Sequence, residues 1–102
     1  MTVHHDGCFG CGQANLFGLQ LEGGRFFVKQ DHQGPDGTLH PGVLTTALME
    51  AMLQAGGEAA RVAVSVKGTV PVGQFVEIEA TAAGAVARCD GEVVAEASAP
   101  RA

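Results

Sequence analysis

The residues with the clearest chemical potential lie in one stretch, TLHPGVLTTALMEAM, which covers residues 38–52. His40 and Gly42 stand at the start of a run with helical spacing, and Glu50 follows Gly42 by eight positions. The first backbone N–H groups of a helix have no partner within it, so they can bind an anion or polarise a carbonyl. A carboxylate nearby can act as general base or nucleophile. The stretch therefore predicts a site for a substrate whose reaction develops an oxyanion.

The element that must position these residues is a helix expected from Pro41 to Ala55. Proline suits the first turn of a helix, and Gly56-Gly57 provides a stop. Apolar residues cover most of the circumference, which predicts a largely buried helix. The polar exceptions are four apart and form one narrow stripe: Thr46, Glu50 and Gln54.

Strands are expected on both sides of this helix. Their patterns occupy residues 16–22, 25–30, 61–70, 74–81, 85–89 and 92–99. Gly23-Gly24 and Asp90-Gly91 are turn signals between neighbouring strands. Residues 1–15 are rich in Gly and Cys and are expected to be irregular, and residues 31–42 read as a loop. The order of two strands, one helix and a four-stranded meander predicts an α+β fold, in which a curved antiparallel sheet wraps the helix.

Length and composition exclude several classes of protein. The chain has 102 residues and a net charge of −5, so one globular domain over residues 1–102 is expected. Its six basic residues are scattered: Arg25, Lys29, Arg61, Lys67, Arg88 and Arg101. This argues against nucleic acid as a partner. The longest apolar run, Val43–Ala55, is too short and too polar to span a membrane. Three cysteines and a polar start favour reduced thiols in the cytoplasm.

Three motifs in the expected order resemble those of the hotdog-fold thioesterase superfamily. They are CFGCGQANLFGLQL (residues 8–21), HQGPDGTLHPGVLTTALMEAM (residues 32–52) and PVG followed by VEIEA (residues 71–80). The resemblance implies a hotdog fold and a homodimer or homotetramer whose sheets join edge to edge. It also implies a site at the dimer interface for an acyl-CoA-type thioester, with no further cofactor. In such a site a helix carboxylate acts as nucleophile or general base, and the N–H after the histidine polarises the thioester carbonyl.

Two departures from the family pattern fall on this chemistry. Pro41 replaces the glycine that would donate its N–H, and Met49 replaces the carboxylate. Losing an oxyanion donor costs about 10²–10³-fold in rate, and losing a general base costs about 10²–10⁴-fold. A shift by one residue restores both groups, because Gly42 and Glu50 have the family spacing of eight positions. Two hypotheses follow: a thioester hydrolase, or a non-hydrolytic protein that binds acyl-CoA or serves as a scaffold.

For the hydrolase, Glu50 is the nominated catalytic residue. The nominated substrate-binding residues are His40, Gly42, Val43, Thr46 and Met49. Arg61 and Lys67 are candidates for binding coenzyme A phosphates, with solvated surface charges as the alternative. His32 is expected to be structural or on the surface.

The opening HHDGCFGC contains a C-x-x-C pair, Cys8 and Cys11, next to His4 and His5. A structural zinc ion needs four ligands, and these residues can just supply them. The chain has no second C-x-x-C pair, and both histidines lie close to a terminus. No metal site is therefore expected, and zinc remains the alternative.

Overall fold

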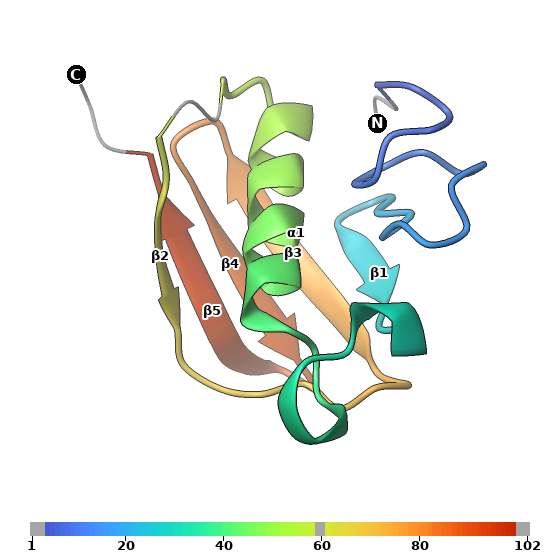
Figure 1. Cartoon of the computed structure of the whole chain (residues 1–102). Coiled ribbons are helices and arrows are strands. Elements are labelled where there is room, and N and C mark those ends of the chain that lie inside the picture. Colours follow the sequence, from blue (N-terminus) through green and yellow to red (C-terminus); the bar gives the residue numbers. More distant parts are fainter. Residues whose placement is uncertain (1–3, 59–60, 100–102) are drawn as a thin grey trace.

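In the computed structural model, residues 4–58 and 61–99 are described, and they form one α-helix packed against a five-stranded antiparallel sheet (Figure 1). The helix α1 is Pro41–Gln54, and the strands are β1 (Arg25–Phe27), β2 (Ala63–Val66), β3 (Phe75–Thr81), β4 (Gly84–Cys89) and β5 (Glu92–Ser98). This confirms the predicted α+β class and the helix boundaries to within one residue. Residues 1–3, 59–60 and 100–102, which include Arg101, lie outside the described ranges.

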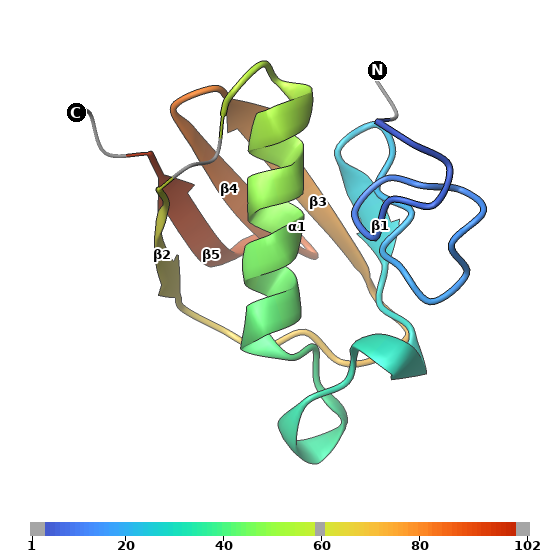
Figure 2. The ribbon, with the colours of Figure 1, turned by 45° about the horizontal axis from the view of Figure 1, so that its top comes forward.

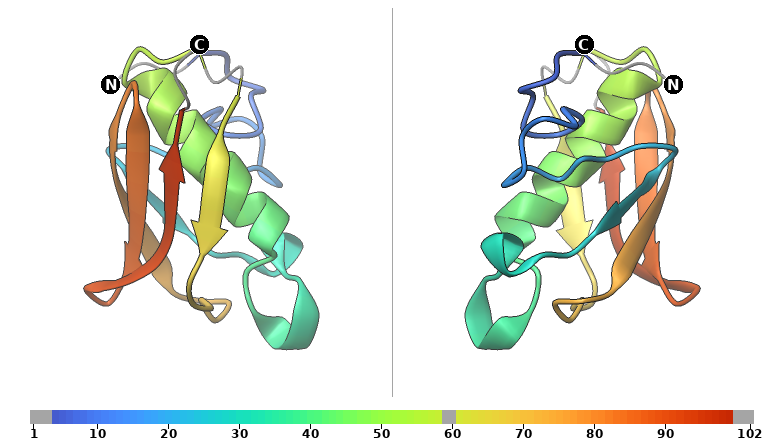
Figure 3. Two further views of the ribbon diagram at one scale, coloured as in Figure 1. Left: turned by 90° about the vertical axis from the view of Figure 1, so that its left-hand side faces the viewer. Right: turned by 90° about the vertical axis from the view of Figure 1, so that its right-hand side faces the viewer.

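The helix lies across one face of the sheet and packs on β3, β4 and β5 (Figure 3). Its buried residues include Leu44, Leu48 and Met52, which recur every four positions and so share one side of the helix. The facing residues of β4 and β5 are small and buried: Ala85, Ala87, Ala95 and Ala97. Small side chains there leave room for the helix to approach the sheet closely.

Three of the strands form the consecutive hairpins β3–β4–β5. Between β4 and β5, Asp90 and Gly91 have φ values of 51° and 81°. Two positive φ angles at the centre of a two-residue loop are the requirement of a type I′ turn, which matches the natural twist of the flanking strands. The turn predicted from the Asp-Gly pair is therefore confirmed.

The prediction of a four-stranded meander is wrong, because β2 pairs with β5 and not with β3. The sheet order is β1-β3-β4-β5-β2, which leaves β2 at an edge. After β2, the chain crosses below the start of the helix, where Leu39 N–H donates to Val70 O at 2.8 Å. This crossing explains why the strand predicted for residues 61–70 stops at Val66 and why Val70 is buried outside any strand.

The strand predicted for residues 16–22 is also wrong, apart from a single bridge between Glu22 and Arg25. Gln20 has a φ of 53°, which interrupts the extended conformation. The N–H groups of Leu19 and Leu21 donate to the carbonyls of Phe9 and Gly10 at 2.7 and 2.8 Å. Residues 4–20, called the N-terminal segment below, thus fold on themselves beside β1 and one flank of α1 (Figure 2).

Candidate functional site

The start of α1 is capped by its own histidine. His40 is the N-cap residue, and its Nδ1 accepts a hydrogen bond from Gly42 N–H at 2.9 Å. Val43 and Leu44 donate to the carbonyl of His40 at 2.9 and 3.0 Å, and Pro41 has no N–H. The N–H groups of Gly42, Val43 and Leu44 are therefore all hydrogen-bonded to His40, and Pro41 has no N–H group. The two nominated donors, Gly42 and Val43, are both engaged in this way.

The other nominated residues on the helix have separate surroundings. Thr46 Oγ1 donates to the carbonyl of Gly42 at 3.0 Å, which is a local bond along the helix. Met49 is half-buried and lies one helical turn beyond Thr46 on the same side of the helix. His40 is exposed to solvent beside the first turn.

A pocket of about 400 Å³ lies beside the start of the helix, between the turn at residues 35–39 and the chain that leaves β2. Its lining residues are Pro35, Asp36, Thr38, Leu39, Pro41, Leu44, Val66, Gly68, Thr69 and Val70. None of the five nominated substrate-binding residues is among them, although Pro41 and Leu44 come from the same helical turns. Sequence reasoning missed this pocket because it depends on the crossing of residues 67–74 below the helix.

Glu50, the nominated catalytic residue, is only 5% exposed and is covered by the N-terminal segment. Its Oε2 accepts a hydrogen bond from Gln54 Nε2 at 2.9 Å and lies 3.1 Å from His4 Nδ1. Its Oε1 lies 3.7 Å from Cys8 Sγ. Eight residues separate Glu50 from Gly42, which is about 12 Å along a helix axis. The carboxylate therefore faces a cluster of its own and not the pocket.

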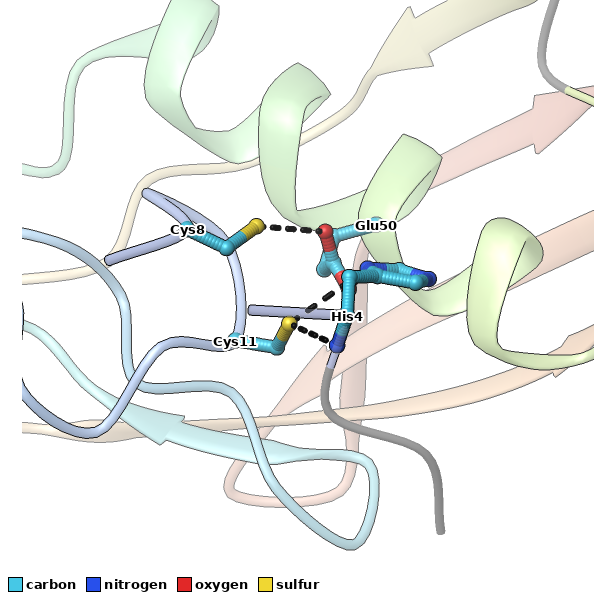
Figure 4. A group of neighbouring side chains, drawn as sticks. All are labelled: His4, Cys8, Cys11 and Glu50. Atoms are coloured by element: carbon cyan, nitrogen blue, oxygen red, sulfur yellow. Dashed lines mark hydrogen bonds and ion pairs between the residues drawn. The ribbon is translucent and has the colours of Figure 1, made fainter. Parts of the chain in front are cut away.

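That cluster consists of His4, Cys8, Cys11 and Glu50, whose ligand-capable atoms all lie within 4.8 Å of one another (Figure 4). Cys11 Sγ lies 3.4 Å from His4 Nδ1 and accepts the backbone N–H of His4 at 3.2 Å. Burial raises the pKa of the Cys11 thiol, and the hydrogen bond from the His4 backbone opposes this rise. The sequence predicted no metal site because it contains no second C-x-x-C pair and because both histidines lie close to a terminus. The fold adds Glu50 and places His4 against it.

The N-terminal segment is held in place by two basic side chains that the sequence does not mark as functional. Lys29 Nζ donates to the carbonyls of Leu16 and Gly18, each at 2.9 Å, and to Gln20 Oε1 at 2.7 Å. His32 is fully buried, its Nδ1 accepts from Lys29 N–H, and its Nε2 lies 3.1 Å from Gly18 O. His32 was expected to be structural or on the surface, and its burial and hydrogen bonds show that it is structural.

The two residues considered for coenzyme A phosphates are both at the surface. Lys67 Nζ pairs with Glu96 at 3.3 Å, and both side chains are about half exposed. Arg61 is exposed just before β2. This placement agrees with the alternative of solvated surface charges.

The chain is similar to known proteins at the level of the fold. No model of a protein family matches it, and no curated protein does. Among solved structures it is similar to the TT0310 protein from Thermus thermophilus, with 19% identity and a TM-score of 0.55, over 76% of this chain and 82% of that one. It is also similar to thioesterase superfamily member 2 from Mus musculus, with 16% identity and a TM-score of 0.50, over 72% and 67% of the two chains.

An uncharacterized protein, PH1136 from Pyrococcus horikoshii, has the same TM-score of 0.50 at 16% identity, over 76% of this chain and 73% of that one. In this chain the shared fold is one α-helix packed on a five-stranded antiparallel sheet. The chain therefore has the hotdog fold of thioesterase superfamily structures, as its sequence motifs predict.

Proposed function

We propose that this protein binds an acyl-CoA-type thioester in the pocket beside the start of α1 and does not hydrolyse it. The observation that carries the second half of this proposal is the hydrogen bond from Gly42 N–H to His40 Nδ1, at 2.9 Å. An oxyanion needs a donor that is aimed at it and not already used, and that donor is a large part of catalysis by acyl-transfer enzymes. Here Gly42 N–H is engaged, and Pro41 at the preceding position has none to offer.

The position of the carboxylates supports the same conclusion. Glu50 is buried against His4 and Cys8 and does not line the pocket. Met49, which stands where the resemblance places the catalytic carboxylate, has no basic atom that could activate water. Asp36 lines the pocket, but it lies on an exposed turn and not on the helix. Neither half of the family mechanism therefore has its group in place.

A thioester ligand is supported by the character of the pocket. Its lining combines apolar side chains such as Leu39, Leu44 and Val70 with the backbone of a glycine, which suits an acyl chain or a pantetheine arm. The hotdog fold shared with thioesterase superfamily structures favours the same ligand class.

The proposal includes a homodimer, or a tetramer built from such dimers, that joins the sheets at β2. This strand is at the edge of the sheet. An edge strand has unpaired backbone groups along one side and is a template for pairing with a second strand. Light scattering at micromolar concentration should give twice or four times the mass of 10.4 kDa. A monomer would contradict this part of the proposal.

Within the ranges that the structure describes, no helix has the length and apolar character needed to cross a membrane. The three cysteines are free thiols. The proposal also includes a location in the cytoplasm, which the sequence predicts from its reduced thiols.

Binding is tested by calorimetric titration with acyl-CoAs of increasing chain length, together with free coenzyme A. We expect affinity to rise with the length of the acyl chain. Val66→Glu puts a charge at the apolar pocket wall and should weaken binding by about tenfold or more. Ser65→Glu is the matched control, because adjacent strand residues point to opposite faces and Ser65 does not line the pocket. No binding to any acyl-CoA, or equal effects of the two variants, would overturn the proposed ligand.

Hydrolysis is tested with the same acyl-CoA panel on the wild-type protein and on Glu50→Gln. The proposal expects turnover at background in both proteins. If the wild type turns over acyl-CoA above background and Glu50→Gln abolishes this turnover, then Gly42 acts as donor and Glu50 as base. Their positions would then be shifted by one residue from the family pattern.

A further inference from the structure

We propose that His4, Cys8, Cys11 and Glu50 form a closed tetrahedral binding site for Zn²⁺ that fastens the N-terminal segment to α1. The four side chains come from two parts of the chain that are about forty residues apart, and they converge on one point (Figure 4). The proposal stands apart from the proposed ligand, because the cluster shares no residue with the pocket.

Three separations between donor atoms are close to the edges of a coordination tetrahedron, and all four donor atoms lie within 4.8 Å of one another. Zinc lies about 2.3 Å from sulfur and about 2.0 Å from nitrogen or oxygen, so neighbouring ligand atoms are about 3.3–3.8 Å apart. In the cluster, His4 Nδ1 is 3.1 Å from Glu50 Oε2 and 3.4 Å from Cys11 Sγ, and Cys8 Sγ is 3.7 Å from Glu50 Oε1. A zinc ion at the centre requires one carboxylate oxygen to serve as the ligand and the wider separations to shorten by up to about 1 Å.

The charge and burial of the cluster also favour a cation. Glu50 is 5% exposed and Cys11 is fully buried. A buried carboxylate is costly unless an opposite charge compensates it. Among the described residues, the one basic side chain in an ion pair with Glu50 is His4, which carries a charge only when protonated. A divalent ion would offset two of the three negative charges that the carboxylate and the two thiolates carry.

The set of donors selects the metal and the kind of site. Two sulfurs, one imidazole nitrogen and one carboxylate oxygen suit Zn²⁺, whereas Mg²⁺ and Ca²⁺ require six or more oxygen ligands. Four protein ligands leave no position for substrate or water, so the site is structural and not catalytic. Two further contacts support the ligands: Gln54 Nε2 donates to Glu50 Oε2, and His4 N–H donates to Cys11 Sγ. Such outer contacts orient ligands and tune metal affinity.

The consequence of the site would be order in a segment that has little regular structure of its own. From residue 4 to residue 20 the described chain forms turns, with neither helix nor strand. Without the metal, its contacts with the rest of the fold include the bonds of Lys29 and His32, the packing of Leu19, and the contacts of His4 and Cys8 with Glu50. Zinc binding would therefore be coupled to the folding of this segment.

The first test is zinc binding by the untagged chain after removal of metal with a chelator. We expect one zinc per chain with a Kd of about 50 nM or tighter, measured in competition with a chromophoric chelator. Cobalt(II) at the same site should give the intense visible bands of tetrahedral coordination and a thiolate charge-transfer band. Binding weaker than about 1 µM, or a cobalt spectrum without the thiolate band, would overturn the proposal.

The variants use the third cysteine as a matched control. Cys8→Ser and Glu50→Gln each remove a ligand and should weaken zinc binding by at least about 10–100-fold. Cys89→Ser makes the same chemical change in β4, outside the cluster, and should leave affinity and stoichiometry unchanged. Equal zinc affinity in Cys8→Ser and Cys89→Ser would refute the assignment of the ligands.

A measurement on the wild-type chain keeps the test decisive if the variants fail to fold. Zinc should protect Cys8 and Cys11, but not Cys89, from alkylation by iodoacetamide, as followed by mass spectrometry of the peptides. If zinc leaves the alkylation of all three thiols unchanged, the four side chains form a metal-free hydrogen-bonded cluster instead.

Discussion

Substitution of Gly10 by alanine tests whether Glu50 is held where the structure places it. Gly10 is buried, and a Cβ added there would lie 2.5 Å from Cγ and 2.6 Å from Cδ of Glu50. Carbon atoms in contact are normally about 3.5–4.0 Å apart, so the carboxylate would have to leave its position. Gly10→Ala therefore acts on the cluster without changing any of its four residues.

The magnitude follows from the bonds that move with the carboxylate. Glu50 would lose the hydrogen bond from Gln54, and a bond to a charged group contributes about 1.5–3 kcal/mol. Replacing glycine by alanine stabilises the fold by about 0.4–1 kcal/mol, because it restricts the unfolded chain. The net expectation is a loss of about 1–2 kcal/mol in the free energy of unfolding. For a domain of this size that lowers Tm by about 4–16 °C.

The assay is urea unfolding in the presence of a chelator, so that the result does not depend on bound metal. Gly7→Ala is the control, because it lies in the same segment and its Cβ would meet only the exposed His5 ring, at 3.2 Å. We expect the control to change the free energy of unfolding by less than about 0.5 kcal/mol.

A double-mutant cycle then isolates the clash. In a Glu50→Ala background, Gly10→Ala should cost nothing, because the atoms that it would strike are gone. If Gly10→Ala destabilises the protein equally in both backgrounds, the reasoning about Glu50 is wrong.

Three further predictions concern residues outside the cluster. His40→Ala removes the helix cap and should lower the free energy of unfolding by about 0.5–2 kcal/mol, and His40→Ser should retain most of it, as measured by urea unfolding. Lys29→Met should destabilise the fold by about 1–3 kcal/mol and expose the N-terminal segment to proteolysis, whereas Lys67→Met should cost less than about 1 kcal/mol. Burial, together with the carboxylates of Asp90 and Glu92, raises the pKa of the Cys89 thiol above its ordinary 9.0. The folded state therefore favours the neutral thiol, and the stability that this provides is present below pH 9 and is lost as the pH rises above 9. Cys89→Ser should therefore reduce the loss of stability above pH 9, as followed by Tm against pH.

Each of these predictions has a result that would contradict it. Equal stability of His40→Ala and His40→Ser would show that the cap contributes nothing. Equal effects of Lys29→Met and Lys67→Met would show that the three bonds of Lys29 are no stronger than a surface ion pair. An unchanged alkaline decline in Cys89→Ser would assign that decline to other groups.

The sequence by itself determined the elements that depend on short-range physics. The helix begins at the proline of its first turn and ends just before the glycine pair Gly56-Gly57, so its boundaries were predicted to within one residue. The Asp90-Gly91 turn was predicted because few residue pairs adopt two positive φ angles. The motifs of the chain also predicted the hotdog fold, which the solved structures bear out.

The tertiary structure decided what depends on residues distant in sequence. The pairing of β2 with β5 follows from the path of the chain below the helix, which no local pattern records. Leu16–Glu22 alternates like a strand, but the nearest free backbone partners belong to Phe9 and Gly10, so it pairs there.

The candidate site shows the same division. The spacing of Gly42 and Glu50 marks a helix with a donor at one end and a carboxylate eight positions later. Whether a donor is free, and where a carboxylate points, depends on the rest of the fold. In this fold His40 Nδ1 accepts the hydrogen bond of Gly42 N–H. The N-terminal segment brings His4 and two thiols to Glu50, although Cys8 and Glu50 are 42 positions apart in the sequence. A side chain's partners are fixed by packing, and packing joins residues that no short window of sequence contains.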